Sequence, residues 1–109
     1  MNTADSLRKL EKLAQLMRDR DLSRLTQASL QKSHTQGLLS ALDKTQPATG
    51  LDLVVAAKVV DRFGLWTTNR RILLNQQLAR DTVNWMAAKA DAQKSFGRAE
   101  VLGKLTKRR

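Results

Sequence analysis

The residues that could carry catalysis are few and are poorly placed for it. The chain has no cysteine, and its single histidine, His34, cannot build a metal site or a catalytic triad unaided. Asp19 and Asp21 lie two residues apart, so on a helix they point to different faces and cannot share an acid–base task. The glycines are too scattered to form a phosphate-binding loop. We therefore expect a protein that is not an enzyme and that binds no cofactor or metal, with His34 on an exposed helix surface.

The strongest local signal is a basic C-terminal segment. Its last twelve residues hold five Lys and Arg residues against Glu100, a net charge of +4. The whole chain has 20 Lys and Arg against 10 Asp and Glu, a net charge of +10. Such cations stabilise the negative end of a helix dipole, or they are simply a solvated tail. They also attract an acidic partner, whether an acidic protein, a nucleic acid or a membrane surface.

Apolar residues at steps of three and four predict two long amphipathic helices rather than strands. We expect the first helix at about 6–42, with Ser6 as its N-cap, and the second at about 51–107. The segment 43–50 holds the only proline and small polar residues, which favours a loop. The longer stripe follows these positions: Ala56, Val60, Phe63, Thr67, Leu74, Leu78, Trp85, Ala88, Ala92, Phe96 and Ala99.

Two helices joined by a short loop form an antiparallel hairpin. We predict one all-α domain over residues 1–109, a long two-helix coiled-coil hairpin in which residue i faces about 93 − i. In this register Leu10 faces Val83. The same register pairs Asp21 with Arg70 or Arg71 and Lys32 with Asp61, which suggests that opposite charges set the alignment, although these side chains could equally extend to water.

The predicted register leaves the end of the second helix, residues 91–109, without a covering partner. Apolar side chains there, surrounded by positive charge, are typical of a helix-docking site. Trp66 has surplus apolar surface and is an equally good candidate for core or partner contact. The predicted partner-binding residues are Phe96, Arg98, Val101, Leu102, Lys104, Leu105, Lys107, Arg108, Arg109 and Trp66.

In length, basic charge and helical pattern the chain resembles the flagellar FliJ family and its injectisome stalk relatives. The resemblance is strongest in the second helix, where an aromatic, a Leu/Gln-rich segment and a later tryptophan precede a basic end. Here these are Trp66, RRILLNQQLAR (70–80), Trp85 and KSFGRAEVLGKLTKRR (94–109). The glycines and the loop proline depart from a single unbroken coiled coil, which puts a straight stalk in doubt.

The resemblance implies a non-enzymatic component of type III protein export that binds the export ATPase, the export gate protein and export chaperones. It also implies a cytoplasmic protein that reaches the inner membrane only through those partners. The N-terminus has no signal-peptide core and no apolar run is long enough to span a membrane, which agrees with this location. The alternative is a basic helical nucleic-acid-binding protein, which is disfavoured because no stacking aromatics interleave with the tail. Self-association remains open.

Overall fold

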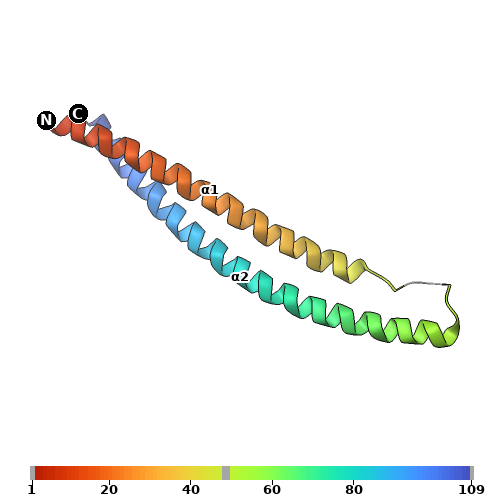
Figure 1. The fold of residues 1–109 in the computed structure, drawn as a ribbon. Helices are drawn as coiled ribbons and strands as arrows, with labels where there is room; N and C mark the ends of the chain where they lie inside the picture. Colours follow the sequence, from red (N-terminus) through yellow and green to blue (C-terminus); the bar gives the residue numbers. More distant parts are fainter. Residues whose placement is uncertain (1, 48–49, 109) are drawn as a thin grey trace. The chain divides into compact units, whose positions relative to one another are not determined.

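The chain folds into two long α-helices that pack antiparallel, as the apolar periodicity predicts. The computed structural model describes residues 2–47 and 50–108. Within them, helix α1 spans Thr3–Lys44 and helix α2 spans Leu53–Lys107 (Figure 1). The all-α hairpin is therefore confirmed. Both helices begin and end within three residues of the expected positions.

The helix ends differ in detail from the sequence prediction. The side chain of Asn2 caps α1, because its Oδ1 accepts a hydrogen bond from the backbone N–H of Asp5 at 2.9 Å. Ser6, the predicted cap, lies one turn inside the helix. Before α2, the carbonyl of Asp52 accepts the first helical hydrogen bond from Ala56 at 2.6 Å, whereas Gly50 lies in the loop with φ of 80°. A glycine suits that left-handed conformation. Thr49, the other suggested cap, lies outside the described residues.

Helix α2 continues without interruption through all three of its glycines. Gly64, Gly97 and Gly103 each have helical conformation, and a Cβ added at Gly64 or Gly97 would meet no atom within 4 Å. A glycine inside a helix costs about 1 kcal/mol relative to alanine. Here that cost does not break α2, because the helix extends well beyond each glycine.

The structure divides into two compact units, and each is described by itself. Unit 1 joins the first 30 residues to the residues from Val83 onward, and unit 2 holds Gln31–Thr82. The ends of α1 and α2 that carry the chain termini lie together in unit 1 (Figure 1).

Small residues form the seam between the two helices of unit 1. Ala14 and Asp21 of α1 are buried, and α2 contributes Ala92, Ser95 and Ala99. Small side chains allow two helices to approach closely, and larger side chains then have to lie at the edges of the seam. The larger apolar residues of α1, such as Leu10 and Leu13, are accordingly half exposed.

The predicted register of unit 1 is wrong, although the stripes themselves are largely correct. Leu10 lines the same groove as Val101 rather than Val83, a difference of 18 residues, or about five helical turns. Asp21 accepts a hydrogen bond from Ser95 and forms ion pairs with Arg20 and Arg24, not with Arg70 or Arg71.

The predicted C-terminal overhang is therefore also wrong. Residues 91–109 were expected to lack a covering partner, yet Ala92, Ser95 and Ala99 are buried and Glu11 of α1 lies 3.8 Å from the position of a Cβ on Gly103. The sequence reasoning paired opposite charges, but the buried aspartate takes a small hydroxyl as its cross-helix partner because the cations remain exposed at the surface.

In unit 2, α2 extends past the end of α1 at the loop (Figure 1). Asp43, next to the last residue of α1, binds Arg71 at 2.6 Å. The preceding part of α2, about 53–70, therefore has no α1 residues opposite it, over roughly 27 Å at 1.5 Å per residue. Thr35 faces Asp81 in this unit, so the predicted Lys32–Asp61 pair is about 20 residues out of register.

Hydropathy gives no sign of a membrane span in the described part of the chain. Neither α1 nor α2 contains a stretch that is apolar enough, over sufficient length, to cross a bilayer.

Candidate partner-docking groove

An open apolar groove runs along one edge of the seam in unit 1. It has a volume of about 500 Å³. Leu10, Leu13 and Met17 of α1 form one wall at helical spacing, and Val101 and Leu102 of α2 lie on the other. Gly97 has no side chain to fill the space between the walls, and a Cβ placed there would touch nothing. The groove is thus a consequence of small residues at the seam and a missing side chain beside it.

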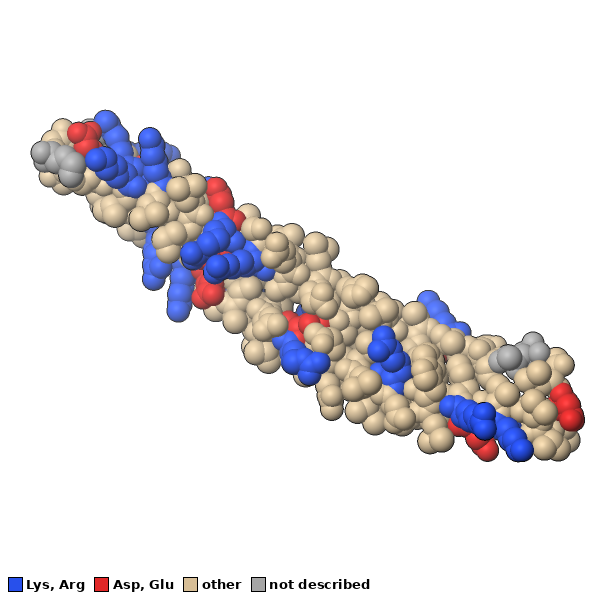
Figure 2. Space-filling view, in the orientation of Figure 1, with Lys and Arg blue, Asp and Glu red and all other residues tan. Residues whose placement is uncertain are grey.

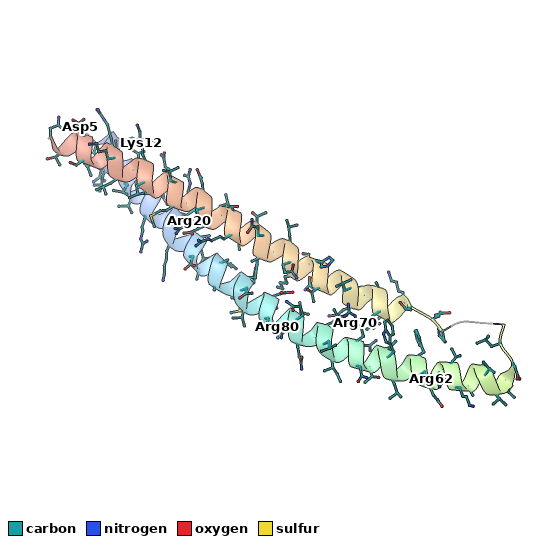
Figure 3. The ribbon with its side chains drawn as sticks, viewed as in Figure 1. Asp5, Lys12, Arg20, Arg62, Arg70 and Arg80 are labelled. Carbon is teal, nitrogen blue, oxygen red and sulfur yellow. The ribbon has the colours of Figure 1, made fainter. Side chains whose placement is uncertain are left out.

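Cations border this groove. Lys94 and Arg98 line it directly, and both also line an adjoining polar hollow together with Arg20 and Asp91. Arg20, labelled in Figure 3, reaches this hollow from α1. Three cations and one exposed carboxylate beside an apolar groove favour a ligand that is apolar on one face and acidic along its edge.

The wider charge distribution points the same way. Unit 1 contains 13 of the 20 Lys and Arg residues but only six of the 10 acidic residues. Figure 2 shows Lys and Arg side chains concentrated on the part of the surface formed by unit 1. Such an excess of positive charge raises the local concentration of acidic partners and their association rate.

A buried carboxylate beneath the polar hollow holds the groove's walls together. The hydroxyl of Ser95 donates a hydrogen bond to Oδ2 of Asp21, and Arg20 Nε binds Oδ1 at 3.2 Å. The hydroxyl bond, helped by Arg20 and Arg24, lowers the pKa of Asp21 below its ordinary value of 3.8 despite its burial. Asp21 is therefore ionised at neutral pH and links α1 to α2 at the end of the groove.

A matching contact occurs in unit 2. Thr35 donates to Oδ2 of Asp81 at 2.5 Å, and Gln77 donates to Oδ1 at 2.8 Å. The Thr35 bond is the main reason that the pKa of Asp81 lies below its ordinary value, and a bond from Gln31 adds to it. Each unit thus buries one aspartate whose cross-helix partner is a hydroxyl.

The predicted partner-binding residues fall into three groups. Arg98, Val101 and Leu102 line the groove. Phe96 lies outside the groove's lining, with its ring centroid 5.7 Å from the guanidinium carbon of Arg18. The remaining members lie elsewhere on the surface: Lys104, which pairs with Glu100 at 3.3 Å, Leu105, Lys107, Arg108, and Trp66 in unit 2, whose ring lies 6.0 Å from that of Phe63, while Arg109 lies outside the described residues.

Sequence reasoning missed the α1 wall of the groove and its closest cations. Leu10 and Met17 were expected in the core, and Leu13, Lys94 and Gly97 were not singled out. The spacing of Lys94, Gly97, Arg98 and Val101 is that of one helix face, so periodicity alone could have grouped them. It could not have shown what faces them, because the register was wrong.

The described residues do not suggest metal chemistry. Among residues 2–47 and 50–108, no three His, Cys, Asp or Glu side chains come together in a way that could hold a metal ion. Comparison with protein-family models, with curated proteins and with solved structures finds no match to this chain. The inference of function therefore depends on the groove and its charges.

Proposed function

We propose that the chain is a non-enzymatic docking protein that holds an acidic amphipathic helix of a partner protein in the groove of unit 1. The observation that carries this proposal is a groove of about 500 Å³ with apolar walls and Lys94 and Arg98 at its border. An amphipathic helix buries its apolar face in such a groove at intervals of three or four residues. Acidic residues on the helix edge would then meet the cations.

The resemblance to the flagellar FliJ family suggests where such a protein would act. Under that proposal the chain is a cytoplasmic component of type III protein export, peripheral to the inner membrane through its partners. The docked helix would belong to the export ATPase, the export gate protein or an export chaperone. The basic helical hairpin supports this proposal, and the groove supplies a specific contact surface for it.

Binding to the purified export ATPase tests both parts of the proposal. We expect Leu13→Glu and Arg98→Glu each to weaken binding at least tenfold, because one puts a charge into an apolar wall and the other repels an acidic helix. Arg62→Glu makes the same charge change in unit 2 and should alter binding less than about twofold. Fluorescence anisotropy of the labelled chain measures each affinity.

Two results would contradict the proposal in different ways. Unchanged affinity in both groove variants would show that the ATPase does not use the groove. If the chain instead retains nucleic acid through purification and loses it steeply as salt is raised, the nucleic-acid-binding alternative is favoured.

A further inference from the structure

The overhanging part of α2 in unit 2 carries a second apolar face, separate from the docking groove. Three adjacent pairs of large apolar residues recur on α2 at intervals of 11 and 7 residues, which together make five helical turns. Their exposed fractions range from 46% to 68%. We call them the outer face of α2: Val54, Val55, Leu65, Trp66, Ile72 and Leu73.

The outer face lies away from the side of α2 that unit 2 already covers. The opposite side of this segment carries Ala56, Val59, Phe63 and Thr67, which are half buried, and then Leu74, which is 5% exposed. A helix that is apolar on two opposite sides needs two partners, and unit 2 supplies only one.

The amount of apolar surface on the outer face suits a small protein interface. With about 150–250 Å² for a large side chain, six side chains that are about half exposed present roughly 600–700 Å². Two such faces together would bury about 1,300 Å², which is within the range of specific protein–protein interfaces.

The charge of the overhang favours a second copy of the same chain as the occupant. The segment 51–69 is electrically neutral, with Asp52 and Asp61 balancing Lys58 and Arg62, although the chain as a whole has a net charge of +10. An acidic partner would gain nothing from a neutral face. Two identical chains, in contrast, can meet here without bringing their excess positive charge into the contact.

The segment is also self-complementary when two copies run antiparallel. A two-fold axis that places Val54 opposite Leu65 of the other copy also places Lys58 opposite Asp61, twice by symmetry. Leu53, which is 84% exposed, then lies opposite Trp66. We propose that two copies of this chain associate through the outer faces of α2, as an antiparallel pair of helices about this axis.

Sedimentation equilibrium of the full chain over a range of concentrations tests this proposal. We expect a reversible dimer of twice 12.2 kDa, with a dissociation constant on the order of 10 µM, because the interface lies near the small end of the specific range. Leu65→Glu should weaken dimerisation at least tenfold. Leu13→Glu, a matched change in the groove of unit 1, should leave dimerisation unchanged. Circular dichroism should show unaltered helix content in both variants, since Leu65 and Leu13 are mainly exposed.

A charge exchange tests the two-fold arrangement itself. Lys58→Glu and Asp61→Lys should each weaken the dimer, and the double variant should restore it, because each copy then again presents opposite charges across the axis. A chain that stays monomeric up to ~100 µM would overturn the proposal. So would a dimer that survives Leu65→Glu but is lost in Leu13→Glu, which would assign self-association to the groove.

Discussion

At the scale of single residues, the buried aspartates define the alignment of each unit. Apolar contacts along a seam of alanines differ little between neighbouring registers, because the side chains are small and alike. A buried carboxylate is different, because it destabilises any register in which it has no hydrogen-bond donor. Ser95 provides that donor for Asp21, and Thr35 provides it for Asp81.

Removal of the Ser95 hydroxyl should therefore destabilise unit 1 in a pH-dependent way. The folded pKa of Asp21 lies below its unfolded value, so ionised Asp21 contributes stability above the unfolded pKa, and this contribution is lost as pH falls through the folded value. Ser95→Ala should lower the melting temperature at pH 7 and reduce the loss of stability between about pH 5 and pH 2. Ser23→Ala, at an exposed serine of α1, is the matched control and should change neither.

Carboxyl NMR titration provides a direct measurement of the same effect. The pKa of Asp21 should rise in Ser95→Ala relative to the unaltered chain, because the largest favourable contact of the carboxylate is gone. An unchanged pKa would mean that Arg20 and Arg24, not Ser95, hold the carboxylate in its charged form.

At the scale of helices, the sequence was sufficient to predict both elements but not their mutual alignment. The 3.6-residue periodicity identified α1, α2 and the loop around Pro47, because it depends on which residues of one helix share a face. Alignment depends on which residues of the other helix lie opposite, and the sequence contains more than one charge pairing that looks satisfactory. The α2 wall of the groove could be predicted in part through Arg98, Val101 and Leu102. The α1 wall could not, since it follows from the register.

Cysteine cross-linking distinguishes the two registers cleanly, because the chain has no cysteine of its own. Oxidation should join the cysteines in the variant Leu10→Cys/Val101→Cys, whose parent residues line the same groove. It should not join those in Leu10→Cys/Val83→Cys, where the second position lies about 27 Å farther along α2. Non-reducing electrophoresis at low protein concentration reports the outcome. The reverse pattern would restore the 93 − i register and remove the groove.

At the scale of the whole chain, the end of α2 is part of the fold as well as a docking surface. Ala99 is buried, and the segment after it lies beside the first turns of α1. Earlier expectations from sequence treated this segment as free. The structure assigns it both tasks, which means that large deletions there cannot separate binding from stability.

Deletion of Gly97–Arg109 should consequently reduce helix content by more than the 13 residues removed. The first turns of α1 would lose the residues that cover them, and isolated helical segments of that length are marginal in water. Circular dichroism should show a loss of roughly twice the deleted residues, since about as many α1 residues would lose their partners. A loss limited to 13 residues, with unchanged melting of the remainder, would show that α1 does not need this segment.

The proximity of the chain ends in unit 1 has a practical consequence for reporter fusions. Asn2 lies eight residues before Leu10, and Arg108 lies six residues after Leu102, so each end is only about 10 Å along its helix from the groove. A fluorescent protein or affinity tag at either terminus would crowd the same docking surface. An insertion in the 45–52 loop would spare that surface but lie next to the overhanging segment of α2. Fusion position would thus decide which of the two interactions an imaging or capture experiment can detect.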